Sequence, residues 1–197
     1  MRGRFLALEG GEATGKTTQA RLLAERLGAL LTREPGGTEV GERVRELVLD
    51  PAMPVSSRTE ALLMAAARAQ HVAQVIEPTL ASGRTVVTDR FTASSLAYQG
   101  AGRGLELAEV AALSAFATAG LQPDLIILLD LPLDVTAARL SSEPDRLEME
   151  GAPFHARVAA GFRQLAAADP QRWVVVPATG SIDEVAARVW AAVDRLP

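Results

Sequence analysis

The sequence predicts an α/β protein in which a parallel sheet lies between two layers of helices. Five short apolar segments alternate with longer segments of helical character along the 197 residues. The apolar segments are nearly continuous runs rather than alternating ones, which is typical of strands covered on both faces. No repeat, low-complexity tract or linker interrupts the order. We therefore expect one three-layer domain over residues 1–197.

Each element of the first half is predicted by its pattern of apolar residues. These elements are a strand at 5–9, a helix to about residue 27, a strand at 29–32, a helix around 40–49, a helix over 59–82, a strand at 85–88 and a short helix ending near residue 98. The helix over 59–82 has a broad apolar face. Pro78 is expected to bend or end it, because proline lacks a backbone N–H.

The second half continues the same alternation. Its elements are a helix at 105–119, a strand at 125–130, a helix beginning at 133–140, a helix at about 153–168, a strand at 173–176 and a final helix. The final helix has a clear start signal, because Ser181 is followed three residues later by Glu184 in a capping-box pattern. The polar segment SSEPDRLEMEG interrupts the alternation before the helix at 153–168.

Composition and charge restrict the class of protein. The chain is 48% hydrophobic and 22% charged, which is a globular composition. A net charge of −4 argues against a nucleic-acid partner, although a local basic pocket stays possible. Cysteine is absent, which excludes disulfides and thiolate metal sites. The apolar runs are too short for a signal peptide or membrane span, so we expect a cytoplasmic protein without a membrane partner.

A glycine-rich segment, GGEATGKT at residues 10–17, matches the nucleotide-binding pattern G-x-x-x-x-G-K-[ST]. It follows an apolar strand and opens a helix, which is the context that the pattern requires. Glycines allow backbone N–H groups to surround phosphate oxygens, and the helix N-terminus adds partial positive charge. Lys16 is the only lysine of the chain. Its compact ammonium group fits such a loop, whereas the planar fork of arginine does not.

The loop predicts ATP binding, with Mg²⁺ as the accompanying metal. The residues expected to hold ATP are Gly10, Gly11, Glu12, Ala13, Thr14, Gly15, Lys16, Thr17 and Thr18. The Thr17 hydroxyl is the expected protein ligand of Mg²⁺ from this loop. A glycine-rich turn with a solvated lysine is the alternative. The motif alone does not distinguish a kinase from a GTPase or an ATP-driven machine.

Three further segments could form a second pocket facing this loop. They are TREPGGT at 32–38, LLMAAARAQH at 62–71 and TDRFTASSLAYQG at 88–100. The last segment leaves the carboxyl end of an expected strand, where ligands bind in open α/β sheets. Asp89 could therefore hold Mg²⁺ or its waters, and Arg90 could bridge donor and acceptor phosphates. The alternative is a local ion pair between these two residues.

Other residues of these segments are open to two interpretations. Met64 and Arg68 are four residues apart and share a helix face. Arg45 and Arg68 could be solvated, although Arg68 lies in a largely apolar helix. His71 has no obvious partner in the sequence, and neither has His155, so both histidines are interpreted as ordinary structural residues.

Taken together, the phosphate loop, REPGGT followed by G-E-x-x-R, and DRFTASSLAYQG resemble the thymidylate kinase family. The similarity runs nearly from end to end, and the last two motifs are far more specific than the loop. The resemblance implies transfer of the γ-phosphoryl group of ATP to dTMP, with Mg²⁺, to form dTDP for dTTP biosynthesis. It also implies a five-stranded parallel sheet, a mobile lid, and a homodimer formed through apolar helices.

The resemblance also implies which residues contact the acceptor. They are Glu12, Arg45, Met64, Arg68, Arg90, Ser95, Tyr98 and Gln99. Arg45 and Arg90 would bind the acceptor phosphate, because guanidinium groups pair well with phosphate oxygens. Glu12 would approach the sugar 3′-OH. Tyr98 would crowd the 2′ position and so favour deoxyribose.

Residues at the base show a first departure from the family. Arg68 and Ser95 would hydrogen-bond the thymine edge, with Gln99 nearby. Family members generally have phenylalanine, stacked on the thymine ring, where this chain has Met64. A thioether fills space but does not stack as a ring does, so we expect base contact with altered geometry.

The lid, expected at about 139–151, is the second departure. In the family a catalytic arginine lies either in the phosphate loop or in the lid, and this chain has Ala13 at the loop position. The lid segment ARLSSEPDRLEME carries only Arg139 and Arg146, and the sequence leaves open which of the two acts. A solvated loop without a catalytic role is an alternative. The catalytic residues expected overall are Lys16, Asp89, Arg90, Arg139 and Arg146.

Rival functions stay open at this point. One is a P-loop kinase for a nucleoside or for a different nucleoside monophosphate, and REPGGT with DRFTASSLAYQG argues against it. Another is a non-enzymatic switch that binds ATP and hydrolyses it slowly or not at all. The arginines around a second pocket argue against that reading. A structural protein with an incidental loop is the third.

Overall fold

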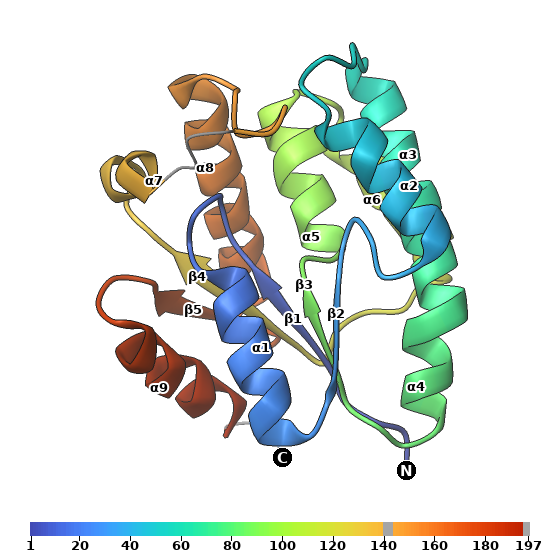
Figure 1. Ribbon diagram of the computed structural model, residues 1–197, viewed down its shortest axis with the longest axis vertical. Coiled ribbons are helices and arrows are strands. Elements are labelled where there is room, and N and C mark those ends of the chain that lie inside the picture. The colour runs from blue at the N-terminus through green and yellow to red at the C-terminus, as the bar shows by residue number, and fades with distance from the viewer. Residues whose placement is uncertain (140–143, 195–197) are drawn as a thin grey trace.

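The computed structural model describes residues 1–139 and 144–194. Over these residues the chain forms a five-stranded parallel sheet with strand order β2-β3-β1-β4-β5 and helices on both faces (Figure 1). The strands are β1 (Phe5–Glu9), β2 (Leu30–Arg33), β3 (Val86–Asp89), β4 (Leu125–Asp130) and β5 (Trp173–Pro177). The predicted fold class and all five strands are confirmed, with ends that differ from the expected ones by a single residue.

The helices also follow the predicted order. They are α1 (Lys16–Leu27), α2 (Glu39–Leu49), α3 (Ser57–His71), α4 (Glu77–Ala81), α5 (Thr92–Ser95), α6 (Leu107–Thr118), α7 (Leu133–Arg139), α8 (Ala152–Ala168) and α9 (Ile182–Val193), with π-helical segments η1 (Val72–Ile76) and η2 (Leu96–Gly102). The capping box predicted from Ser181 and Glu184 is present at the start of α9. None of the described helices combines the length and apolarity needed to cross a bilayer.

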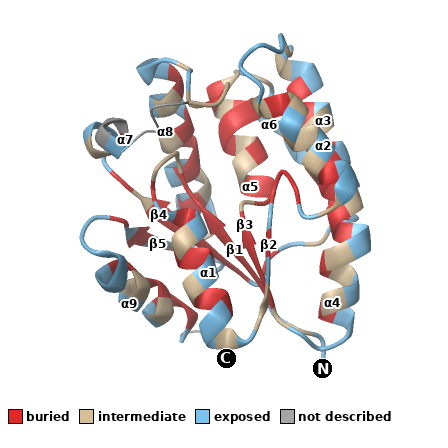
Figure 2. Cartoon of the chain, in the orientation of Figure 1, coloured by how far each residue is buried: buried red, intermediate tan, exposed pale blue. Residues whose placement is uncertain are grey.

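The sheet has an apolar cluster on each face, as its continuous apolar strands require. On β1, Phe5 and Ala7 belong to the cluster covered by α3, η1, α4, η2 and α8. Leu6 and Leu8 belong to the cluster covered by α1 and α9. Successive strand residues point to opposite faces, and here both faces are buried (Figure 2). The central strand is thus a rigid support for the loop that follows it.

The long helical segment predicted at 59–82 is confirmed, but it changes its winding midway. It begins at Ser57, and after His71 it passes through the wider turn η1 before continuing as α4. The backbone N–H of Glu77 donates to the carbonyl of Val72, five residues back. Pro78 follows directly, lacks an N–H, and would clash with the carbonyl of residue 74 in a regular α-helix. The wider turn therefore accommodates Pro78 without ending the helix.

Parallel pairing brings the three functional loops to one edge of the sheet. Leu8 of β1 and Arg33 of β2 both pair with Asp89 of β3. The glycine loop, the REPGGT segment and the DRF segment therefore leave adjacent strands at the same level. That edge is where a ligand site is expected in an open α/β sheet.

Candidate active site

The glycine loop connects β1 to α1 at the carboxyl edge of the sheet (Figure 1). Gly10 has a φ of 148°, and a Cβ there would lie 2.6 Å from the carbonyl oxygen of Leu129. Gly15 has a φ of 84° immediately before the first helical residue. Both positions require glycine, because L side chains are strained at such angles and Gly10 has no room for one. The predicted context of the motif is confirmed.

Lys16 is buried within this loop. Its Nζ donates to the carbonyl of Gly11 and lies 3.4 Å from Thr14 Oγ1. Burial, followed by the repulsion of Arg90, lowers the pKa of Lys16 to about 8. The ammonium group is thus held at the loop and partly desolvated, a setting in which a phosphate anion would stabilise its charge.

Thr17 and Asp89 form the arrangement expected for a metal site. Thr17 Oγ1 donates to Asp89 Oδ2 at 2.6 Å. The other carboxylate oxygen, Asp89 Oδ1, is buried and has no hydrogen-bond partner among the described residues. The described residues contain no group of three or more metal-ligating side chains. The site suits Mg²⁺, which commonly takes one or two protein oxygens and completes its shell with phosphate and water.

Arg90 lies between the loop and a neighbouring cavity. Its guanidinium donates to the Gly10 carbonyl at 2.9 Å, to Glu12 Oε1 at 2.9 Å and to the Tyr98 hydroxyl at 3.1 Å. Tyr98 also donates to Glu12 Oε1. The backbone of Arg90 has a φ of 73°, an unusual angle for a non-glycine residue and one that occurs often at functional sites.

This cluster is strongly coupled electrostatically. Burial opposes ionisation of Glu12, but Arg90 and Lys16 outweigh it and hold its pKa at about 2. Burial would lower the pKa of Arg90, but Glu12 and other acidic groups raise it above its ordinary value. Both groups are therefore charged at neutral pH and fix each other's position.

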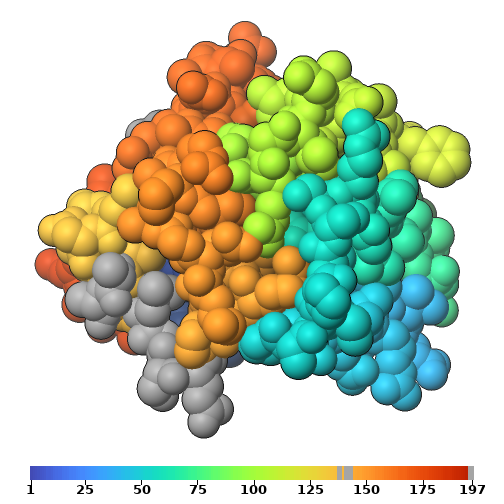
Figure 3. Space-filling model, turned by 90° about the horizontal axis from the view of Figure 1, so that it is seen from above, coloured from blue at the N-terminus to red at the C-terminus, as the bar shows by residue number. Residues whose placement is uncertain are grey.

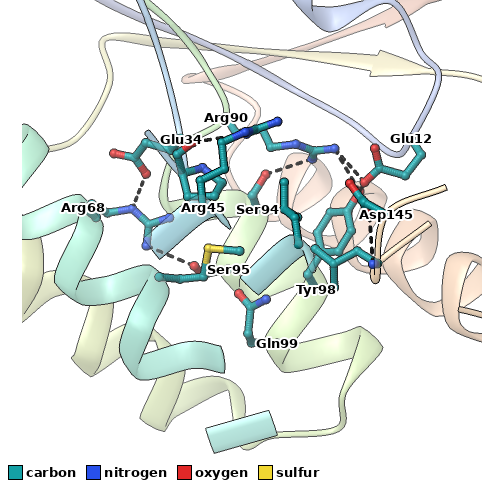
Figure 4. A pocket seen from close by; sticks show the side chains of 14 residues that line it. Glu12, Glu34, Arg45, Arg68, Arg90, Ser94, Ser95, Tyr98, Gln99 and Asp145 are labelled. Carbon is teal, nitrogen blue, oxygen red and sulfur yellow. Dashed lines mark hydrogen bonds and ion pairs between the residues drawn. The ribbon is translucent and has the colours of Figure 1, made fainter. Parts of the chain in front are cut away.

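The acceptor-side residues predicted from the sequence line one cavity. It has an empty volume of about 630 Å³ and is shown in Figure 4. Every residue expected to contact the acceptor lies on its wall. A second cavity, of about 910 Å³, is lined by residues 12–18 and Asp89. Both cavities share Glu12, Glu34, Arg45, Arg90 and Asp145, so two guanidinium groups and three carboxylates lie at their junction.

Arg68 is held rigidly at the deep end of the first cavity. Its Nε donates to Glu34 Oε2 at 2.6 Å, one Nη donates to Ser95 Oγ at 3.0 Å, and the other donates to the Phe91 carbonyl at 3.0 Å. Arg68 is only 3% exposed. The interpretation of Arg68 as a solvated helix residue is therefore wrong.

Gln99 is oriented by a carboxylate on α3. Its Nε2 donates to Oε1 of the fully buried Glu60 at 2.8 Å. Because the amide nitrogen is used in this way, the amide oxygen is the end of Gln99 that can serve a ligand in the cavity. Arg103 also donates to Glu60, at 3.1 Å.

Arg146 lies elsewhere than a lid residue facing ATP is expected to lie. Its Nη2 donates to Glu60 Oε2 at 2.6 Å and its Nε donates to the Val48 carbonyl at 2.8 Å. Its backbone N–H bonds to the Leu49 carbonyl at 3.0 Å. It does not line the phosphate cavity, whereas its neighbours Asp145 and Glu148 do. From above, the segment after residue 143 lies against the α2–α3 region (Figure 3).

The other lid arginine lies at the far end of the lid. Arg139 is the last residue of α7 and is exposed. Residues 140–143, which belong to the expected lid at 139–151, lie outside the described residues. The sequence offers two lid arginines, and the structure places them in different environments.

Several contacts of this region are not predictable from the sequence. His71, which we expect to be an ordinary structural residue, is fully buried and hydrogen-bonded to Glu34 and Thr32. Glu34 belongs to the REPGGT motif, so its place in a specific motif was the available signal. Glu60 carried no such signal, because a carboxylate near the start of a helix is usually solvated. His155, by contrast, has a buried Nε2 without a hydrogen-bond partner in the described part of the chain.

Comparison with known proteins shows extensive similarity. A family model described as Thymidylate kinase matches residues 8–189. The thymidylate kinase of Synechococcus sp. (strain JA-2-3B'a(2-13)) is 55% identical over 201 residues, covering 98% of this chain and 96% of that protein. The thymidylate kinase of Deinococcus radiodurans is 50% identical over 200 residues, covering 98% and 97%. A crystal structure of thymidylate kinase from Ehrlichia chaffeensis superposes with a TM-score of 0.80 at 32% identity, covering 98% of this chain and 99% of that one.

Proposed function

This chain belongs to the thymidylate kinase family, and we propose a role for each of its site residues in the phosphorylation of dTMP. The protein is a kinase that transfers a phosphoryl group from ATP to dTMP and forms dTDP. One observation carries the assignment of residues: the acceptor-side cavity and the phosphate-loop cavity share a wall, and that wall contains Arg45 and Arg90. An in-line transfer needs two phosphates to face each other at such a junction.

The acceptor is placed by the chemistry of the cavity wall. The dTMP phosphate lies between Arg45 and Arg90, which supply charge-assisted donors. The sugar lies against Tyr98 and Glu12, where the Tyr98 ring leaves little room for a 2′-hydroxyl. Its 3′-hydroxyl faces the Glu12 carboxylate.

The base occupies the end of the cavity formed by α3 and η2. Arg68 presents N–H donors to a base carbonyl, and the oxygen of Gln99 accepts from a base N–H. Met64 covers the ring with a flexible thioether. Ser95 supports this arrangement by accepting a hydrogen bond from Arg68 at 3.0 Å.

ATP lies with its phosphates in the glycine loop. Backbone N–H groups of residues 12–18 and the Lys16 ammonium group hold the β- and γ-phosphates. Thr17 and Asp89 are the residues that would hold Mg²⁺, through the Thr17 hydroxyl and the buried Asp89 Oδ1. Bound there, Mg²⁺ neutralises charge on the phosphate oxygens.

Catalysis then rests on positioning and charge. Lys16 and Arg90 face the transferring group from the donor side and the acceptor side. We assign the lid arginine to Arg139, because Arg146 is bound to the buried Glu60 and Arg139 is the only other arginine of the lid segment. We propose that residues 1–197 form one kinase domain with its lid at about 139–151.

We propose a homodimer formed through α3 and α6. The helix α6 is apolar nearly all round, and its Phe116 is 88% exposed. Leu62 on α3 and Leu107 on α6 are also exposed. Exposed apolar residues gathered on two neighbouring helices favour a second copy of the chain as their cover. We place the enzyme in the cytoplasm, where deoxynucleotide synthesis uses its product.

The experiment that tests this function is an acceptor panel. ADP release is measured with MgATP and each of dTMP, dUMP, UMP, AMP, GMP and thymidine. We expect the highest kcat/KM with dTMP. A preference for thymidine would indicate a nucleoside kinase, and slow ADP release that no acceptor accelerates would indicate an ATP-binding switch. Either outcome would overturn the proposal.

A further inference from the structure

A chain of buried polar side chains lies behind Arg68 and takes no direct part in phosphoryl transfer. Glu34 binds Arg68 Nε through Oε2 at 2.6 Å, and its Oε1 lies 3.0 Å from His71 Nδ1. His71 Nε2 lies 2.6 Å from Thr32 Oγ1. Each of the four residues is buried, with an exposed fraction of at most 9%. Such burial is costly unless every polar group is paired, and here the pairing is continuous.

The direction of the key hydrogen bond follows from the partners. An ionised carboxylate only accepts, so His71 Nδ1 must donate to Glu34 Oε1. The second ring nitrogen and the Thr32 hydroxyl share the other hydrogen bond. Two hydrogen bonds therefore fix the plane of the His71 ring, and the ring in turn fixes the Glu34 carboxylate from the side opposite Arg68.

Glu34 determines where the free donors of Arg68 point. A guanidinium group has five N–H donors. Glu34, Ser95 and the Phe91 carbonyl each take one, at Nε, Nη1 and Nη2 respectively. One N–H on each terminal nitrogen is left for a ligand. Because the bond at Nε is one of the three that fix the planar group, loss of Glu34 alignment would shift both free donors relative to the base.

The loop that carries Glu34 is packed onto the same ring. Gly37 has a φ of 75°, and a Cβ there would lie 2.7 Å from both His71 Nε2 and Thr32 Oγ1. The backbone at Gly37 therefore packs directly against the histidine ring. The hydrogen-bonded side chains of His71 and Thr32 leave no room for a water molecule there. His71 is thus a fixed support for the loop rather than a filler of the core.

We propose that His71 and Thr32 are positioning residues for recognition of the nucleobase. They hold Glu34, Glu34 orients Arg68, and Arg68 selects a base that presents a carbonyl oxygen rather than an amino group. This inference rests on the proposed function, because it requires the base to lie against Arg68. It adds a determinant of acceptor specificity one hydrogen bond beyond Glu34, which itself lines the acceptor cavity.

Two substitutions separate the two hydrogen bonds of His71. His71→Asn places an amide N–H at the position of Nδ1 and keeps the donor to Glu34. His71→Gln places its amide at the position of Nε2 and loses that donor. We expect His71→Gln to raise the KM for dTMP about tenfold, with kcat and the KM for ATP within a few-fold of wild type. We expect His71→Asn to stay close to wild type.

If His71 had a purely structural role, its substitution would leave the discrimination between bases unchanged. We therefore measure this discrimination. The ratio of kcat/KM for dTMP to that for 5-methyl-dCMP compares a 4-carbonyl with a 4-amino group on otherwise similar nucleotides. His71→Gln should narrow this ratio about tenfold. Thr32→Val, which removes only the distal hydrogen bond, should narrow it less, and it serves as the milder variant where His71→Gln folds poorly.

Val72→Ala is the matched control. Val72 is the next residue, is 5% exposed and packs in the apolar core. Its truncation should lower the unfolding temperature and leave the dTMP to 5-methyl-dCMP ratio unchanged. The positioning role of His71 is wrong if wild type prefers dTMP normally while His71→Gln and His71→Asn behave alike, or if the ratio of His71→Gln matches that of Val72→Ala. Absence of dTMP-dependent ADP release in wild type would instead overturn the proposed function, and the positioning role with it.

Discussion

Arg146 donates to Glu60 across 2.6 Å and joins the segment after residue 143 to a carboxylate that is fully buried in α3. The same carboxylate accepts a hydrogen bond from Gln99 at 2.8 Å. One buried anion therefore connects a residue of the expected lid with a residue of the base pocket. This relationship assigns different consequences to the two arginines of the lid segment.

Arg139→Ala and Arg146→Ala should affect different quantities. Arg139→Ala should lower kcat by about 10²- to 10³-fold with small changes in KM, because it removes charge that meets the transferring group. Arg146→Ala should lower the free energy of unfolding by about 2 kcal/mol and act on kcat less than Arg139→Ala does. Steady-state kinetics and urea unfolding of both variants give the comparison. A larger kcat loss in Arg146→Ala would reverse the assignment.

Among substitutions that neutralise one charged side chain, Glu60→Gln should cause one of the largest losses in the free energy of unfolding. It removes the anion that accepts from Arg103 and Arg146, so we expect a loss of about 3 kcal/mol in unfolding free energy and a higher KM for dTMP through Gln99. Glu25→Gln on α1 is the control, because the Arg21–Glu25 pair is exposed, with its N and O atoms 2.7 Å apart. That change should cost less than about 1 kcal/mol. Equal losses in the two variants would contradict the role of Glu60.

The pH dependence of Glu60 has a defined sign. Burial opposes its ionisation, but hydrogen bonds from Gln99, Arg146 and Arg103 outweigh burial and lower its pKa below 4.5. The stabilisation is therefore present above pH 4.5 and is lost as the pH falls through the lower folded-state pKa. Unfolding free energies of wild type and Glu60→Gln should converge as the solution is acidified below this value. A constant difference down to the acid transition would contradict the prediction.

Met64→Phe should retain or improve dTMP affinity. Met64 lines the acceptor cavity and also packs against the apolar core, so an aromatic ring there can cover the base while keeping apolar contacts. Isothermal titration with dTMP measures the effect, and Met64→Ala provides the loss-of-contact reference. A large loss of affinity in Met64→Phe would show that residue 64 does not lie against the base.

ATP binding should weaken above pH 8. The pKa of Lys16 in the free protein is lowered to about 8, by burial first and then by Arg90. Above that pH, ATP binding must be accompanied by proton uptake at Lys16, so the affinity should fall by up to about tenfold per pH unit. Titration with MgATP between pH 7 and 9.5 measures this slope. Lys16→Met should bind more weakly and lack the slope, and a wild-type affinity that is constant up to pH 9.5 would contradict the prediction.

Phe116→Glu should convert a dimer into a monomer. The side chain is 88% exposed on α6, and a charge at the centre of an apolar interface is costly to bury. Sedimentation velocity of wild type and variant measures the change. Arg43→Glu on α2, an exposed residue that forms an ion pair with the nearby Glu46, should leave the association state unchanged. A monomeric wild type would overturn the proposed interface.

The order of elements and the edge that carries the site were predictable from the sequence for a local reason. Apolar runs of strand length define β1 to β5, and motif residues that directly follow a strand, such as Asp89 and the glycine loop, must lie at its carboxyl end. Parallel pairing then brings these ends together. The acceptor-side residues were reached through the specific motifs, and each of them lines the cavity.

The environment of individual polar side chains was not predictable in this way. The sequence leaves open which of Arg139 and Arg146 acts, and it indicates no obvious partner for His71. The partners of His71 lie 37 and 39 positions away, and the partner of Arg146 lies 86 positions away. Such pairs depend on which helices meet across the sheet and on the rotamers that packing allows, neither of which a local pattern encodes.

By itself, the sequence determined the phosphate loop, its single lysine and the alternation of strands and helices, because these depend on neighbouring residues and on backbone geometry. Only the tertiary structure decided that the buried carboxylate of Glu60 binds Arg146 and that His71 is linked to Arg68 through Glu34. Both depend on burial: charged and polar groups removed from water must find partners, and the folded chain, not the local sequence, determines which partners are within reach.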